Sequence, residues 1–365
     1  MKKVLIIFFA WFLAINVFAV LVNNRVNLKP DTSYPWINPS YTFQTQGWDL
    51  KSIHSRWDSY WYNDIAKNGY SVKGEGQLSN IVFFPLYPFL MAAFAIFLGG
   101  NLILAGWLIS SFFILMSSIY LYKIVKEFHP DADPVFAVLL LLIFPTAFFF
   151  NAVYTESTFL FFSLAAFYHT LKKQYLLSSI FGFFGALTRI TGLLLFLPIV
   201  YEYIKEHGKK FLKITLFEFL LIPAGTFLFF FYHYFKFKDL FLFLKVEKLW
   251  GRGFNLNLEQ YKFLTNPAVA NLSLDLFFLV FVLGAAFFVF KRLRASYGIY
   301  MLTTIFVALS SGTTMSIGRY VLILFPIYIL GATIKNEAYR YIWIMVSVLL
   351  LGLYTLLFVT HYWAG

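Results

Sequence analysis

The sequence predicts an all-α polytopic membrane protein, and three observations support this fold class. Of its 365 residues, 60% are hydrophobic and only 13% are charged, about half the charged fraction of an ordinary soluble domain. The apolar residues fall in repeated runs of roughly 15 to 25, the length of a helix that crosses a bilayer. Many of the 29 lysines and arginines flank these runs, as is expected beside anionic membrane lipid.

Composition also excludes several classes of function. The net charge of +12 does not indicate a nucleic-acid partner, because the basic residues lie at the ends of apolar runs. No cysteine is present, so disulfide and thiol chemistry are excluded, and the six histidines are scattered without a His-x-x-x-His pair. Neither a P-loop nor a glycine-rich dinucleotide motif occurs. We therefore expect no cofactor and no metal site of protein ligands, while a requirement for a divalent metal is left open.

The chain begins with Met1-Lys2-Lys3 and an apolar run from Val4 to Val22. This run is longer than the core of a signal peptide, about 7–15 residues, and no clear cleavage site follows it. We expect residues 1–22 to form an uncleaved first transmembrane helix rather than a signal peptide. Its N-terminus is then cytoplasmic.

Residues 23–100 are predicted to form a large first external loop. It ends in an apolar run, 83–98, which resembles a membrane span. If 83–98 crossed, the next helix would leave Lys123 and Lys126 outside; if it lies at the interface, both lysines are cytoplasmic, as the positive-inside rule prefers. We therefore expect 83–98 to be an interfacial helix.

The remainder is predicted as a single membrane domain with alternating spans. It divides into a central transmembrane module, a second external loop and C-terminal transmembrane helices, at 101–235, 236–270 and 271–365. The expected spans after the first are 101–121, 135–151, 157–171, 175–188, 191–204, 214–235, 271–290, 297–314, 319–334 and 341–360. This gives about eleven crossings with the C-terminus outside and short, basic cytoplasmic connections. No simple repeat is visible, which removes one indication of a transporter with inverted repeats.

The longest polar stretch of the chain contains a short predicted amphipathic helix, Arg56–Tyr70. Three apolar side chains recur at helical spacing: Trp57, Trp61 and Ile65. Ser55 is expected to cap the helix, with Asp58 three residues later as in a capping box, and Asn68-Gly69 is expected to end it. Two interpretations of Asp58 stay open. It caps its own helix, or it is presented to a site at the membrane surface.

Further polar side chains fall in turns that the topology places at the external face. Glu156 lies in the turn Tyr154–Ser157, and Arg189 and Arg319 lie in two other turns. Charges near membrane depth are costly and indicate function, and a guanidinium group matches a phosphate well. Each also has a structural interpretation: Glu156 is favoured at a helix start by the dipole, and the arginines could reach lipid phosphates.

Four sequence elements together resemble the PIG-V family, the GPI mannosyltransferase 2 enzymes and their bacterial relatives. The first is the first-loop string Arg56-Trp57-Asp58, Trp61-Tyr62, Ile65-Ala66 and Gly69-Tyr70. The others follow in the family's order: Phe83-Phe84-Pro85-Leu86-Tyr87-Pro88, then Phe144-Pro145-Thr146 through Ala152-Val153-Tyr154-Thr155-Glu156-Ser157, then Ala186-Leu187-Thr188-Arg189 with Gly192. In the last element Leu187 is an extra residue. The C-terminal third is similar only through Gly318-Arg319-Tyr320 and Phe325-Pro326.

The resemblance implies a glycosyltransferase of the GT-C fold with an acidic catalytic residue in its first external loop. Such enzymes take a sugar, typically mannose, from a polyprenyl-phosphate donor. The expected location is the plasma membrane of a prokaryote, with the active site external. The acceptor would be a glycan, a lipid or a protein, and a partner subunit is conceivable because the eukaryotic relatives are thought to work with one.

These expectations give each candidate residue a role. Asp58 is the candidate general base that takes the proton of the acceptor hydroxyl, with inversion at the anomeric carbon as the family implies. Arg189 and Arg319 would stabilise the departing phosphate. The remaining candidates for substrate binding are Arg56, Trp57, Trp61, Tyr62, Asp64, Tyr154 and Glu156. Among these, the aromatic rings could stack on sugars, and Glu156 or Asp64 could orient hydroxyls or replace Asp58 as the base.

Two other functions are weighed against this one. A transporter or flippase of lipid-linked saccharides would use the same arginines and aromatic residues without needing a base. The lack of charged residues in most span centres counts against ion-coupled transport. An assembly subunit with a decayed site is disfavoured by the intact elements around Asp58, Glu156 and Arg189.

Overall fold

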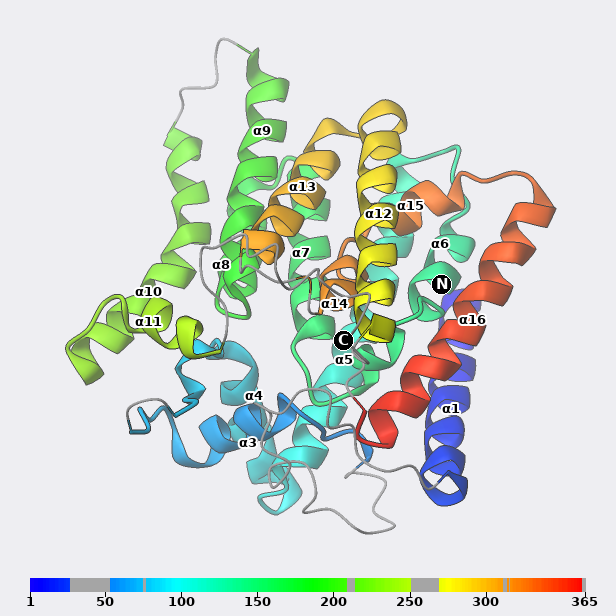
Figure 1. The fold of residues 1–365 in the computed structure, drawn as a ribbon. Coiled ribbons are helices and arrows are strands. Elements are labelled where there is room, and N and C mark those ends of the chain that lie inside the picture. The colour runs from blue at the N-terminus through cyan, green and yellow to red at the C-terminus, as the bar shows by residue number, and fades with distance from the viewer. Residues whose placement is uncertain are drawn as a thin grey trace.

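The computed structural model describes residues 1–26, 53–74, 77–208, 214–250, 269–310, 314 and 316–362. All regular secondary structure in these residues is helical, and they contain no β-strand (Figure 1). Five helical segments are long and apolar enough to cross a membrane: α1 (Lys2–Arg25), α5 (Leu102–Phe128), Leu216–Phe237 with α10 (Leu221–Phe237), Leu274–Arg292 within α12 (Val269–Arg292), and α16 (Glu337–Val359). The prediction of an all-α membrane protein is confirmed.

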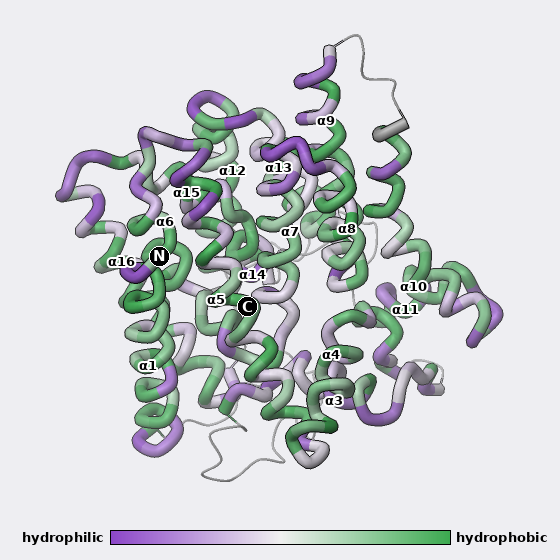
Figure 2. Tube along the Cα trace, turned by 180° about the vertical axis from the view of Figure 1, so that it is seen from behind, coloured by the Kyte–Doolittle hydropathy of each residue, from purple (hydrophilic) through white to green (hydrophobic). Residues whose placement is uncertain are grey.

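Shorter helices complete the bundle between these segments. They are α6 (Pro134–Leu142), α7 (Glu156–Leu171), α8 (Tyr175–Ala186), α9 (Phe196–His207), α13 (Ala295–Ser310), α14 (Ile317–Leu322) and α15 (Pro326–Ala332). Figure 2 shows the helices as mostly hydrophobic, with hydrophilic residues gathered in the connections at their ends. Helix α7 is buried along most of its length, so it occupies the centre of the bundle.

Two of the predicted spans are interrupted rather than continuous. Helix α6 ends at Leu142, and the chain continues past Pro145 into the 3₁₀-helical segment η4 (Ala147–Asn151). In the same way α14 ends at Leu322, and α15 begins with Pro326 at its first position. Proline lacks an N–H group and disfavours helical conformation in the residue before it. The expectation of one helix over each of these segments was therefore wrong, while the count of about eleven crossings stays a prediction.

Two short helices lie together at one end of the molecule, α3 (Ser59–Asn68) and α4 (Leu86–Ala95) (Figure 1). Helix α3 packs on α4, and α4 packs on α5. The segment Leu86–Leu98 is a short apolar helix, not one of the five long enough to cross a membrane. Its length agrees with the predicted interfacial helix over 83–98.

The connection between α8 and the 3₁₀-helical segment η5 (Ile190–Leu195) is unusually tight. A Cβ atom on Gly192 would lie 2.2 Å from the carbonyl oxygen of Gly185 and 2.5 Å from Cα of Ala186. Only glycine permits this approach of two backbones. Because Arg189 lies between these residues, the close contact places its side chain at the start of η5.

Candidate functional site

Three hydrogen bonds join the segment Arg56–Ser59 to the turn that precedes α7, and a fourth lies within the segment itself. The Ser59 hydroxyl donates to the Val153 carbonyl at 3.0 Å and accepts from the Arg56 N–H at 3.2 Å. The Tyr154 hydroxyl donates to the Arg56 carbonyl at 3.1 Å and accepts from the Asp58 N–H at 3.2 Å. The backbone of Asp58 is thereby fixed against the turn that precedes α7.

The start of α3 differs from the predicted one. The helix begins at Ser59, so the expected cap by Ser55 was wrong. Asp58 occupies the N-cap position, but its side chain makes no capping hydrogen bond. Trp57 adopts a φ of 52°, a left-handed conformation that is rare for a bulky residue. The end of the helix was predicted correctly, because Gly69 follows Asn68 with a φ of 75°.

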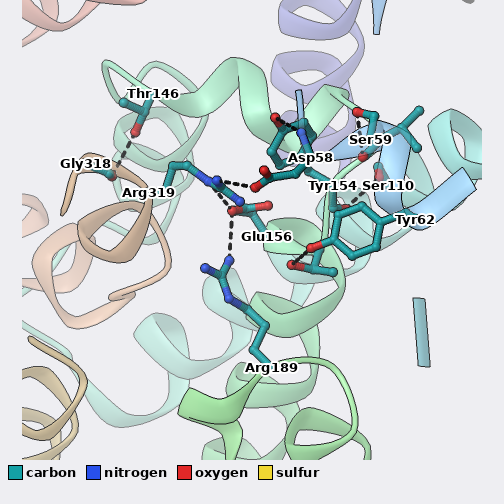
Figure 3. A network of polar contacts seen from close by, with 12 residues as sticks. Asp58, Ser59, Tyr62, Ser110, Thr146, Tyr154, Glu156, Arg189, Gly318 and Arg319 are labelled. Atoms are coloured by element: carbon teal, nitrogen blue, oxygen red, sulfur yellow. Dashed lines mark hydrogen bonds and ion pairs between the residues drawn. The ribbon is translucent and has the colours of Figure 1, made fainter. Parts of the chain in front are cut away.

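Four charged side chains meet in what we call the charge cluster: Asp58, Glu156, Arg189 and Arg319 (Figure 3). Arg319 donates from Nη1 to Asp58 Oδ2 at 2.7 Å and from Nε to Glu156 Oε1 at 2.8 Å. Arg189 donates from Nη1 to the same Glu156 oxygen at 2.8 Å. Two carboxylates and two guanidinium groups make the cluster electrically neutral. Both arginines therefore point inward to protein carboxylates rather than outward to lipid.

Burial varies within the charge cluster. The side chain of Glu156 has 0% exposure, whereas that of Asp58 has 18%. Burial raises the pKa of Glu156, but Arg319 and Arg189 lower it more, so that the net pKa lies below its ordinary value. The second oxygen, Oε2, is buried and accepts no hydrogen bond from the described residues. Glu156 is thus the fully buried carboxylate of the cluster, and Asp58 is the one that solvent or a ligand can reach.

Aromatic rings support both arginines. The Arg319 guanidinium lies 4.7 Å from the ring centroid of Tyr154 and 5.1 Å from that of Phe149. The Arg189 guanidinium lies 5.3 Å from the ring of Tyr320. Such cation–π contacts are most favourable where water is excluded. They hold each guanidinium in a fixed plane.

The segment that carries Arg319 is anchored independently. Thr146, which follows Pro145 in the break after α6, donates its hydroxyl to the Gly318 carbonyl at 3.1 Å (Figure 3). The interruption of the predicted span at 135–151 therefore brings a hydrogen-bond donor to the residue before Arg319.

Other candidates from the sequence have different surroundings. Asp64 accepts hydrogen bonds from the side-chain amides of Asn68 and Asn80, each at 2.8 Å, and so joins α3 to the loop that follows it. Trp61 is buried, with its ring stacked on Phe83 and edge-on to Trp250. Both side chains thus contribute to the packing of the first loop.

The remaining candidates flank the cluster. The Tyr62 hydroxyl lies 3.4 Å from the Thr155 hydroxyl, next to Glu156, and burial raises its pKa above the ordinary value. Arg56 is buried, which lowers its pKa to about 10, and its Nη1 donates to the Ser55 carbonyl at 3.3 Å. Trp57 packs against the main hydrophobic core.

The roles of Ser59, Phe149 and Tyr320 were not predicted from the sequence. Ser59 fixes the Asp58 segment, and the two rings face the arginines. Tyr320 could have been suspected as the neighbour of Arg319, but a serine and a phenylalanine of this chain carry no such signal. Within the described residues, no group of three or more His, Asp or Glu side chains could hold a metal ion.

Comparisons with known proteins give similarity at the level of overall structure. The sequence matches no protein-family model and has no significant match among curated proteins. The crystal structure of the Archaeoglobus fulgidus oligosaccharyltransferase, a complex with Zn and sulfate, aligns with a TM-score of 0.44 at 15% identity, covering 96% of this chain and 53% of that one. The archaeal oligosaccharyltransferase AglB from the same organism, in complex with an inhibitory peptide and a dolichol-phosphate, gives 0.44 at 13% identity, covering 97% and 56%. The chain therefore spans about half the length of these structures, and the PIG-V resemblance rests on the motifs alone.

Proposed function

We propose that the protein is a GT-C-type membrane glycosyltransferase that transfers a sugar, with mannose as the first candidate, from a polyprenyl-phosphate donor. The observation that carries the proposal is the charge cluster. Asp58 and Arg319 are 261 positions apart in the sequence, yet their side chains are in contact. Glu156 and Arg189 come from two further motifs and join them. Charged residues from separate sequence elements, each similar to the same family, thus meet at one site.

Asp58 is the proposed general base. An acceptor hydroxyl must lose a proton as it attacks the anomeric carbon, and a carboxylate within hydrogen-bond reach can take that proton. Oδ2 is engaged by Arg319, whereas Oδ1 accepts no hydrogen bond from the described residues. Because Arg319 and the fixed backbone orient the carboxylate, Oδ1 is the oxygen available to the acceptor.

Arg189 and Arg319 are the proposed binding groups for the donor phosphate. Each guanidinium has five N–H donors, of which the cluster uses one from Arg189 and two from Arg319. The remaining donors can bind phosphate oxygens and stabilise the negative charge of the leaving group. A lipid phosphate leaves readily, so no separate general acid is needed.

Glu156 is proposed to position the arginines. Its side chain has no exposed surface, and one of its two oxygens, Oε1, binds both guanidinium groups and so sets the distance between them. Precise placement of charge before the reaction is what makes electrostatic stabilisation effective. Its free buried oxygen Oε2 remains able to accept one hydrogen bond within the site.

The remaining features of the proposal follow from the resemblance and the topology. The reaction inverts the anomeric centre, and the acceptor is a glycan, a lipid or a protein at the external face of a prokaryotic plasma membrane. No cofactor is required, because arginine can neutralise one monophosphate. A partner subunit is compatible with this arrangement.

The test is sugar transfer in native membranes that contain the protein. We expect label from polyprenyl-phosphate mannose to reach a membrane or protein acceptor, and label from a nucleotide sugar not to reach it in the absence of polyprenyl phosphate. Reconstituted vesicles should show no protein-dependent movement of the labelled lipid across the bilayer. Movement without transfer would instead establish the flippase, which uses the same cluster without a base.

A further inference from the structure

A short amphipathic helix, α11 (Leu242–Leu249), lies in the predicted second external loop. It follows the membrane-length segment Leu216–Phe237, and Figure 1 shows it at the lower end of α10. It also contacts the 3₁₀-helical segment η2 (Asn80–Val82) of the first loop. The roles assigned so far do not include α11, although its two faces differ in what they contact.

The inner face of α11 packs beside the membrane-length helix. Phe243 and Val246 are buried, and the ring centroid of Phe243 lies 5.6 Å from that of Phe230 and 5.8 Å from that of Phe84. Because Phe230 precedes the end of α10 at Phe237 by two helical turns, this contact lies roughly 10 Å back along the helix axis. Helix α11 is therefore folded back beside the last turns of α10 instead of extending away from it.

The outer face of α11 combines large apolar side chains with lysines. Phe241 at the N-cap has 61% exposure, Leu244 has 54% and Leu249 has 46%. Lys245 and Lys248 are exposed on the same face, because positions three and four apart are neighbours on a helix. Exposed apolar surface beside basic groups is typical of a helix that lies in the interface of a bilayer.

The end of α10 carries the features of a membrane boundary. Tyr232 and Tyr234 are exposed there, and tyrosine is enriched at the level of lipid headgroups. Lys236 Nζ lies 5.7 Å from the ring centroid of Tyr232 and 5.3 Å from that of Phe237, and it donates to the Tyr70 carbonyl at 2.7 Å. Such a lysine keeps its stem on apolar surface and its charge at the polar boundary. The boundary therefore lies at the part of α10 that α11 adjoins.

The lysines of the outer face favour a particular kind of lipid. Lys245 forms an ion pair with Asp239 at 2.5 Å, whereas Lys248 forms no ion pair with any of the described residues. The Lys248 ammonium group can therefore bind a phosphate of the membrane surface. A zwitterionic headgroup offsets its phosphate with its own positive group, so an anionic headgroup attracts this lysine more strongly.

We propose that α11 lies in the external leaflet of the membrane and binds anionic phospholipid. Phe241, Leu244 and Leu249 enter the acyl-chain region, and Lys248 binds a headgroup phosphate. This apolar surface continues that of α10, where the exposed Phe231 and Phe235 face hydrocarbon. The inference is independent of the proposed function, because it requires no transfer of sugar.

The same helix is attached to the first loop. Trp250, which follows α11, donates from Nε1 to the Ser79 carbonyl at 3.3 Å. The centroid of its ring system lies 5.2 Å from that of Trp61 and 5.6 Å from that of Phe83. Lipid that holds α11 therefore also restrains the loop that contains α3.

Site-specific fluorescence quenching in lipid vesicles tests the inference. The chain has no cysteine, so Leu244→Cys can carry a single environment-sensitive fluorophore. The matched controls are Leu349→Cys, at an exposed position of the membrane-length helix α16, and Lys205→Cys, at an exposed position near the end of α9. Three quenchers are compared: lipid with a nitroxide near the headgroup, lipid with a nitroxide deep in the acyl chain, and aqueous iodide.

We expect the shallow nitroxide to quench the Leu244→Cys label more than the deep one, and iodide to quench it little. The Leu349→Cys label should respond most to the deep nitroxide, and the Lys205→Cys label to iodide. Quenching by iodide without quenching by lipid would place α11 in water. Protection from all three quenchers would mean that a second copy or another protein covers the helix. Either result would overturn the proposal.

The headgroup preference is measured at the same label. Shallow nitroxide on phosphatidylglycerol should be enriched around Leu244→Cys by about fivefold over the same nitroxide on phosphatidylcholine, the effect of one basic residue near an anionic surface. Adding Lys248→Gln should remove most of this enrichment, whereas adding Lys205→Gln should leave it unchanged. Equal quenching by the two lipids in the protein with Lys248 would refute binding of anionic phospholipid.

Discussion

Replacing Glu156 with glutamine removes the negative charge that two guanidinium groups share. The amide oxygen can still accept a hydrogen bond, so the variant tests charge more than shape. A hydrogen bond to a charged group contributes about 1.5–3 kcal/mol and a neutral one about 0.5–1.5 kcal/mol. Two such bonds, each 2.8 Å long, then lose about 2–3 kcal/mol together. This lies below the ~3–5 kcal/mol for complete loss of one partner of a buried pair, because Arg189 keeps some exposure.

Thermal unfolding of the detergent-purified protein measures this loss. The chain has no cysteine for a thiol-reactive dye but contains nine tryptophans, so intrinsic fluorescence is the suitable signal. A decrease of about 5 °C in the midpoint is expected for Glu156→Gln. The matched control is Glu206→Gln, which removes an exposed ion pair with Lys173 and should change the midpoint by about 1 °C or less. Equal midpoints for the two variants would refute the stabilising role of the cluster.

Three more predictions concern Glu156, Arg319 and Asp64. Burial raises the pKa of Glu156, but Arg319 and Arg189 lower it by more, so that the net pKa lies below the ordinary value of 4.5. The ionised Glu156 therefore stabilises the fold fully above pH 4.5, and this stabilisation is lost as the pH falls through the folded pKa. The difference in unfolding midpoint between wild type and Glu156→Gln should shrink below pH 4.5, and a constant difference would contradict this assignment. Arg319→Lys keeps the charge but cannot bind Asp58 and Glu156 with one planar fork, so donor affinity measured in a filter-binding assay should fall about tenfold or more, and unchanged affinity would remove Arg319 from the donor site. Asp64→Asn retains an acceptor for Asn80 or Asn68, so the transfer rate should change about twofold or less, and loss of transfer would make Asp64 the base instead.

The parts of the fold that depend on composition were open to prediction. Long apolar runs with basic ends define α1, α5 and α16 whatever their neighbours do. The breaks after α6 and before α15 were also signalled, since Pro145 and Pro326 stand inside predicted spans. Hydropathy alone still predicts continuous spans there, because it does not register a missing N–H group.

The residues of the candidate site could be predicted from the sequence, but the contacts between them could not. Charges in the turns at Glu156 and Arg189 stood out against an apolar background, which is a local property. Whether Asp58 caps its helix or faces a site depends on Arg319, 261 residues away, and on the Ser59 bond to Val153 that shifts the helix start. Such contacts arise from tertiary packing, so no local pattern contains them.

The assignment of Asp58 as general base is tested most directly by Asp58→Asn. This change preserves size and an acceptor for Arg319 but removes the carboxylate that takes the proton. With polyprenyl-phosphate mannose as donor, we expect transfer to fall by about 10²-fold or more, while donor binding stays close to wild type. The unfolding midpoint should fall by about 2 °C, less than for Glu156→Gln, because Asp58 makes one charged hydrogen bond to Arg319 and is partly exposed. Transfer by Asp58→Asn at the wild-type rate would contradict the account and move the base to Glu156 or Asp64.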